Sequence, residues 1–176
     1  VLQGAAIPMI AVGASNPDVT RTGDCIFRIN YTDAFQGAAL ARFARETLKA
    51  DTAAQMVNMG NAYSPYLADV FAEQFRQMGG SILLRRDYLG ETRRFEDAAA
   101  ALVEADPDIV FLPGYQDDIA RIIAAARNAG VNAPFIGADG WDESLGSAIG
   151  EAVDGSFYTA HWRPDADFDG GLSEEG

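Results

Sequence analysis

Residues 107–139 read PDIVFLPGYQDDIARIIAAARNAGVNAPFIGAD, and their pattern predicts the unit from which the fold is built. Its apolar run at 109–112 is typical of a buried strand. Apolar residues then recur at helical spacing from 117 to 129, and Gly130 stands where the helix would end. A second apolar run, at 134–137, predicts another strand. A strand, a helix and a strand in this order form the unit that builds a parallel sheet with crossover helices.

The same alternation extends in both directions from this unit. The pattern predicts further strands at 7–12, 26–29, 53–58, 81–88 and 156–159, and further helices at 33–49, 64–78 and 94–105. The predicted fold class is therefore α/β, with a doubly wound, mostly parallel sheet flanked by helices. The acidic segment 163–176 has few apolar residues and is expected to be a linker or a frayed end.

The composition excludes several kinds of protein. With 176 residues and 48% hydrophobic content, the chain can bury one core but not two of ordinary size. The 26 acidic and 13 basic residues give a net charge of -13, and the basic residues form no cluster that could follow phosphates, so nucleic acid is not an expected partner. No stretch approaches the roughly eighteen apolar residues of a membrane span.

The sequence also lacks the motifs of common enzymes and cofactor sites. It contains no glycine-rich dinucleotide fingerprint, no phosphate loop and no G-x-S-x-G nucleophile elbow. Cys25 and His161 are the only cysteine and histidine, so neither an internal disulfide nor a Cys/His zinc site can form. His161 is expected to pack or to be solvated rather than to act as a base. We therefore expect a protein that is not an enzyme and holds no cofactor.

Polar side chains follow four of the predicted strands. Ser15, Tyr63, Tyr115 and Asp139 each come shortly after a strand ends. Because ligands of open parallel sheets bind outside the carboxyl ends of the strands, these side chains are predicted to converge on one rim. Each also has a purely structural interpretation. Ser15 and Asp139 lie in ordinary turn sequences, and the two tyrosine rings could simply cover loop backbone.

Asp33 stands at the start of a predicted helix. Its side chain could accept hydrogen bonds from the free amides of the first turn, and helix capping is the interpretation that the residues favour.

An ordered series of stretches resembles the leucine/isoleucine/valine-binding proteins and their wider type I periplasmic family. The matching stretches are IPMIAVGASNPDVT (7–20), FRINYTDAFQGAALARF (27–43), NAYSPYLADVFAEQF (61–75), DPDIVFLPGY (106–115) and APFIGADGW (133–141). They follow the family's order and spacing, and such a series is much more specific than any one of its parts.

The resemblance implies a two-lobed protein that clamps its ligand at the hinge between the lobes. Ser15 matches a hydroxyl residue that contacts the polar head of an amino acid, and Gly13 and Ala14 match backbone that lines the same place. Asp139 matches the acidic residue that pairs with the ligand's ammonium group, although some relatives have the longer Glu there.

The second lobe is implied to contribute the tyrosines Tyr63 and Tyr115. Asp33 lies where the family has an aspartate just past the first hinge crossing, and 28–31 would be that crossing. We accordingly include Asp33 among the expected ligand-binding residues, beside its capping interpretation.

The implied domain organisation divides the chain into three parts. Residues 1–30 would be the end of the first lobe and the hinge crossing, 31–160 the second ligand-binding lobe, and 161–176 a return crossing or frayed tail. Most of the first lobe is missing from this pattern, so we expect a trimmed or processed piece that carries about half a binding site.

The function implied by the resemblance is capture of an amino acid or similar small polar ligand, in the periplasm or another extracytoplasmic space, for the membrane permease of an ABC importer. The alternative on the same fold is the ligand-sensing module of a receptor or regulator. A kinase, cyclase or DNA-binding segment attached to the same protein would favour the alternative.

Overall fold

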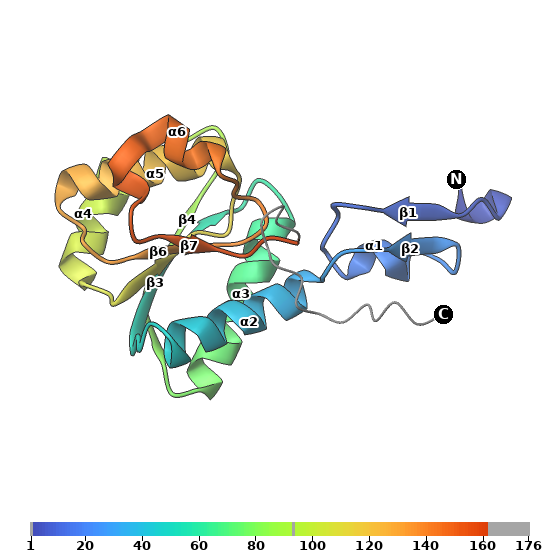
Figure 1. Cartoon of the computed structure of the whole chain (residues 1–176), viewed down its shortest axis with the longest axis horizontal. Coiled ribbons are helices and arrows are strands. Elements are labelled where there is room, and N and C mark those ends of the chain that lie inside the picture. Colours follow the sequence, from blue (N-terminus) through green and yellow to red (C-terminus); the bar gives the residue numbers. More distant parts are fainter. Residues whose placement is uncertain (1, 93, 162–176) are drawn as a thin grey trace, which may run out of the picture.

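The computed structural model describes residues 2–92 and 94–161, and its main part is a five-stranded sheet (Figure 1). The strand order is β4-β3-β5-β6-β7, and every neighbouring pair is parallel. The strands are β3 (Thr52–Asn58), β4 (Ser81–Tyr88), β5 (Ile109–Phe111), β6 (Phe135–Gly137) and β7 (Phe157–Tyr158).

Helices cover both faces of this sheet (Figure 1). One layer is formed by α2 (Asp33–Glu46) and α3 (Tyr63–Gln77), and the other by α4 (Glu96–Ala105), α5 (Gln116–Ala129), α6 (Ser144–Ile149) and the short 3-10 turn η2 (Gly150–Val153). The predicted α/β fold with a doubly wound parallel sheet is therefore confirmed. None of the described helices is long and apolar enough to cross a membrane.

Successive residues of β5 point into opposite layers of the core. Ile109 and Phe111 pack with the apolar faces of α2 and α3, whereas Val110 packs with those of α4 and α5. All three are fully buried. A strand covered on both faces has no polar side, which is why this segment is a continuous apolar run in the sequence.

The helix ends agree with the sequence pattern to within a few residues, with one correction. The α5 helix ends at Gly130, whose φ of 97° suits glycine, as predicted. The helix α2 is capped by Thr32 and not by Asp33: the Thr32 side chain accepts a hydrogen bond from the Phe35 backbone amide at 3.3 Å. The capping interpretation of Asp33 is therefore wrong, because Asp33 is already the first helical residue.

The structure contains short helices that the sequence analysis did not predict, because they are too short to show a helical period. These are α1 (Asp18–Arg21) and α6, together with the 3-10 turns η1 (Gln3–Ala5) and η2. The predicted linker or frayed end at 163–176 lies outside the described residues, as does all but the first residue of the segment expected to be a return crossing.

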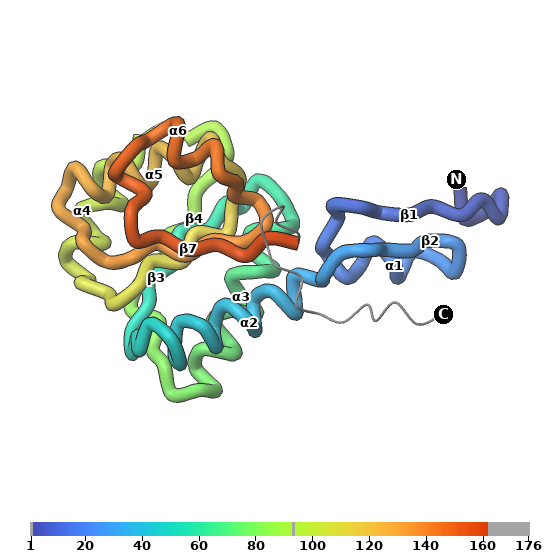
Figure 2. Tube along the Cα trace, viewed as in Figure 1, coloured from blue at the N-terminus to red at the C-terminus, as the bar shows by residue number. Residues whose placement is uncertain are grey.

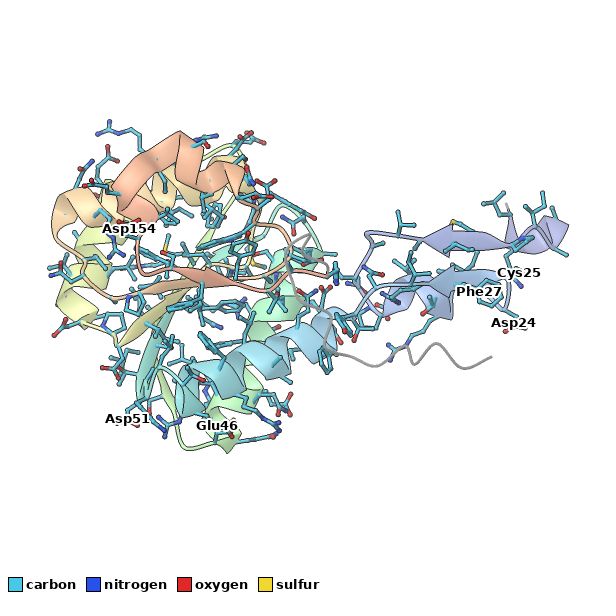
Figure 3. The ribbon with its side chains drawn as sticks, viewed as in Figure 1. Asp24, Cys25, Phe27, Glu46, Asp51 and Asp154 are labelled. Carbon is cyan, nitrogen blue, oxygen red and sulfur yellow. The ribbon has the colours of Figure 1, made fainter. Side chains whose placement is uncertain are left out.

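A small two-stranded sheet lies apart from the five-stranded body (Figures 1 and 2). It pairs β1 (Met9–Ala11) in parallel with β2 (Ile26–Arg28), and α1 lies between them in the chain. Ile10 stands opposite Phe27 in the register. Figure 3 shows Phe27 and Cys25 on this extension, away from the body.

Large apolar side chains of this small sheet are open to solvent. The exposed fractions are 61% for Ile10, 70% for Val12, 52% for Phe27 and 72% for Ile29. Single exposed apolar residues are ordinary, but several gathered on two strands with unpaired edges favour contact with another apolar surface. We call these four residues the exposed strand patch.

We expect this chain on its own to self-associate through the exposed strand patch, and polar substitution of the patch should weaken that association. We expect the double substitution Ile10→Thr, Phe27→Thr to shift sedimentation velocity profiles toward the monomer, because threonine keeps strand propensity while removing apolar area. The free energy of unfolding of the body should change by less than about 0.5 kcal/mol. Val103→Thr, at a lone position that is 45% exposed on α4, is the control. An unchanged profile in the double variant would show that the patch does not drive association.

Candidate functional site

The candidate site lies at the carboxyl ends of β3, β5 and β6, on the side of the body that faces the two-stranded sheet (Figure 1). The chain leaves β3 toward the layer of α3 and leaves the adjacent β5 toward the layer of α5. Neighbouring connections that diverge in this way leave a crevice between them, where ligands of doubly wound sheets bind. Tyr63 begins α3, Tyr115 precedes α5, and Asp139 follows β6.

Tyr63 and Asp139 are directly bonded. The Tyr63 hydroxyl donates to Asp139 Oδ1 at 2.8 Å and accepts from the Gly140 backbone amide at 3.2 Å. Burial and the neighbouring negative charge of Asp139 raise the pKa of Tyr63 well above its usual value, so the phenol stays a donor. One oxygen of the Asp139 carboxylate is therefore fixed from within the lobe.

Tyr115 extends this pair toward solvent. Its ring stacks on the Tyr63 ring with centroids 5.3 Å apart and an interplanar angle of 24°. The residue is 54% exposed. Tyr115 thus offers an aromatic face and a hydroxyl at the open edge of the site.

His161 contacts the second carboxylate oxygen of Asp139. Its Nε2 atom lies 2.7 Å from Asp139 Oδ2, and the exposed side-chain fractions are 24% for His161 and 10% for Asp139. His161 was expected to pack or to be solvated rather than to act as a base, and its contact with Asp139 was not predicted. The available signal was positional: His161 comes shortly after β7, whose carboxyl end lies beside that of β6.

Asp33 brings a second carboxylate into the same region. It is fully buried, and its backbone amide donates to the Ser15 carbonyl at 3.0 Å. Neither carboxylate oxygen has a hydrogen-bond partner of ordinary geometry among the described residues, although the Ser15 side chain lies close enough to lower the pKa. Burial, the largest effect, raises the pKa of Asp33 from 3.8 to about 6, and the charge of Asp139 adds to the increase.

Ser15 is buried beside Asp33, whereas the preceding turn is open. Ser15 is 5% exposed. Gly13 and Ala14 are exposed, and the Ala14 carbonyl accepts a hydrogen bond from the Arg28 guanidinium at 3.0 Å. The structure therefore brings Ser15, Asp33, Tyr63, Tyr115 and Asp139 together in one region and leaves Gly13 and Ala14 on its outer margin.

Gln36 connects the elements that carry the site, and the sequence analysis did not predict this role. Its Oε1 atom accepts from the Asp139 backbone amide at 3.4 Å and from the Thr159 hydroxyl at 2.7 Å. Gln36 is 2% exposed and lies on α2. It therefore holds the ends of β6 and β7 against the first turn of α2. A polar residue on the buried face of a predicted helix was the signal that could have identified it.

A buried polar network fixes the two diverging loops. The Asn58 side chain donates to Asp118 Oδ2 at 2.9 Å, and the Asn58 backbone amide donates to the Ser64 hydroxyl at 2.9 Å. Ser64 in turn donates to the Pro113 carbonyl. The loops after β3 and β5 are thereby tied to each other beneath Tyr63 and Tyr115.

The chemistry of the site is acidic and aromatic. Two carboxylates, one imidazole and the tyrosines suit a small ligand with a cationic group better than a metal ion. Across residues 2–92 and 94–161 no three or more His, Cys, Asp or Glu side chains are grouped so that they could hold a metal. A hollow of about 440 Å³ between α4 and α5, lined by Arg94, Arg121 and Asn128 among others, includes none of the site residues.

Neutralising Asp33 should change how stability depends on pH. A native carboxyl with a raised pKa holds its proton more tightly than the unfolded chain does, so the free energy of unfolding falls as pH rises from about 4 to 6. Asp33→Asn removes this loss. The variant should gain roughly 2 kcal/mol on the wild type between pH 4 and pH 7 in urea unfolding. Asp24→Asn, at the exposed outer end of the small sheet (Figure 3), is the control and should track the wild type. Parallel curves for all three proteins would contradict the raised pKa.

The two stacked tyrosines should differ in their effect on stability. Tyr63→Phe removes a hydroxyl that bonds both Asp139 and the Gly140 amide, so it should lower the free energy of unfolding by about 1–3 kcal/mol. Tyr115→Phe removes an exposed hydroxyl and should cost less than about 0.5 kcal/mol. Urea unfolding at neutral pH measures both, and equal effects would show that the Tyr63 bonds do not stabilise the lobe.

Comparison with known proteins places the chain in a family. The chain matches the model of the periplasmic binding protein family over residues 1–172. It is 27% identical to the leucine-specific-binding protein of Salmonella typhimurium over 169 residues, which are 95% of this chain and 46% of that protein. It is 26% identical to the Leu/Ile/Val-binding protein of Escherichia coli over 161 residues, 90% of this chain and 44% of the relative.

Solved structures show the same fold. A leucine binding protein from Thermotoga maritima superposes with a TM-score of 0.89 at 30% identity, over 94% of this chain and 47% of that chain. A branched-chain amino acid binding protein from Streptococcus pneumoniae, solved with isoleucine, gives a TM-score of 0.86 at 22% identity over the same shares. The chain thus spans about half the length of these relatives. The predicted resemblance is confirmed: the chain belongs to the periplasmic binding protein family.

Proposed function

We propose that the protein containing this chain is a periplasmic or otherwise extracytoplasmic solute-binding protein that captures an α-amino acid for an ABC importer. The observation that carries the proposal is the Asp139 carboxylate, held by Tyr63 at the carboxyl end of β6 and 10% exposed. The relatives named for leucine or for leucine, isoleucine and valine support an amino acid as the ligand. The function is capture and not catalysis.

In this proposal Asp139 pairs with the ammonium group of the ligand. A carboxylate facing an ammonium group in a closed site is desolvated, and a ligand without that charge would leave the carboxylate unpaired. Tyr115 contributes its exposed hydroxyl and ring, and Ser15 contacts the polar head of the ligand from the opposite side. Gly13 and Ala14 line that side with backbone.

The remaining ligand contacts belong to a partner lobe. Residues 31–160 form the second lobe, and 1–30 join it to a first lobe that this chain carries only in part. The exposed strand patch supports this division, because its apolar side chains on two strands with open edges suit packing within a larger sheet. Closure of two lobes about a hinge would then shield the ammonium from water and present a closed shape to the permease.

The substitution Asp139→Asn in the complete protein tests the proposal. It keeps side-chain size while removing the charge, so the calorimetric dissociation constant for L-leucine should rise by about two to four powers of ten. The analogue 4-methylpentanoate, which is leucine without its amino group, should bind the wild type weakly and respond little to the substitution.

The matched control is Asp142→Asn, which neutralises an exposed acid three residues along the same loop. Its affinity for L-leucine should stay within about twofold of the wild type, a difference of roughly 0.4 kcal/mol. If the affinity of Asp139→Asn for L-leucine also stays within that range, Asp139 only stabilises its turn and the ligand is not an α-amino acid.

A further inference from the structure

His161 contacts Oδ2 of Asp139, the oxygen that the ammonium group of the proposed ligand would bind. Of the two Asp139 oxygens, Oδ1 is bonded inside the lobe by the Tyr63 hydroxyl at 2.8 Å, and Oδ2 lies 2.7 Å from His161 Nε2. An imidazole and a ligand ammonium are both donors with the same acceptor within reach. Both cannot make their best contact with Oδ2 at once.

The position of His161 allows its ring to move away from the Asp139 carboxylate. It follows β7 in a bend outside any helix or strand, and its side chain is 24% exposed, against 10% for Asp139. Its neighbours are the Tyr31 ring at 6.0 Å between centroids and the Asn30 side-chain nitrogen at 3.5 Å. A partly exposed ring on a bend can leave the carboxylate at far lower cost than the buried Tyr63 could.

We propose that His161 competes with the cationic group of the ligand for Asp139, so that a cationic ligand binds by displacing the imidazole from Oδ2. This inference rests on the proposed function. An ammonium group is a charged donor and can replace the imidazole at the carboxylate, whereas a ligand without a cationic group cannot.

Charged and titratable groups surround His161. Asp139 faces it directly, and Tyr31 lies beside it. Asp33 is coupled to it by charge, and Asp33 is in turn coupled to Arg28. Raising the pH ionises Asp33, which also favours a cationic ligand, so an experiment must separate this effect from the competition.

Calorimetry of L-leucine binding to the complete protein between pH 5 and pH 7.5 makes this separation. The wild-type dissociation constant should fall as pH rises, because Asp33 ionises near the site. His161→Gln removes the ring that lies on Oδ2 of Asp139. That variant should bind L-leucine more tightly than the wild type at each pH.

Asp33→Asn is the matched variant for the titrating group. It should remove the pH response that Asp33 causes, and the double variant His161→Gln, Asp33→Asn should still bind L-leucine more tightly than Asp33→Asn alone. A His161→Gln protein with wild-type affinity at each pH would overturn the proposal. A His161→Gln protein that melts like the wild type but binds L-leucine poorly at every pH would overturn it too, since His161 would then position Asp139 for the ligand.

Failure of the proposed function would give a different result. In that case L-leucine, L-isoleucine and L-valine would bind neither the wild type at pH 7.5 nor His161→Gln at any pH. The proposed competition would then be wrong together with the proposed function.

Discussion

The structure depends on one feature of its doubly wound sheet. At the adjacent strands β3 and β5, the chain continues to helix layers on opposite faces of the sheet. This divergence opens the rim at which Tyr63, Tyr115 and Asp139 meet. Buried hydrogen bonds from Asn58 and Ser64 tie the two loops to each other at this rim. The sheet and its polar network thus create a place for a ligand before any ligand contact is considered.

Electrostatics at this rim is balanced among very few groups. Asp33 and Asp139 place two carboxylates in one region, and burial makes the ionised form of Asp33 costly. His161 and the Tyr63 hydroxyl each hold one oxygen of Asp139. A site with an unpartnered buried acid and a partnered one beside it is prepared for a cation, since a positive charge would relieve the repulsion between them.

Hydrogen bonds hold the connection between the small sheet and the body in place. The Asp33 amide bonds the Ser15 carbonyl, and Gln36 bonds groups at the ends of β6 and β7. The first turn of α2 therefore contacts both the segment after β1 and the far edge of the rim. Movement at this junction would therefore change the position of groups in the site.

The alternation of strands and helices, the parallel sheet and the rim residues that follow strands were all predictable from the chain alone, because apolar periodicity and turn residues are local signals. The run 109–112 and Gly130 illustrate this, since a buried strand and a helix end are each indicated by adjacent residues. The partners of Asp139 and the burial of Asp33 depend instead on how the elements pack. His161 reaches Asp139 because β7 pairs with β6, and Gln36 reaches it because α2 packs under both strands. Such contacts join residues far apart in the chain, and no local pattern encodes the pairing that brings them together.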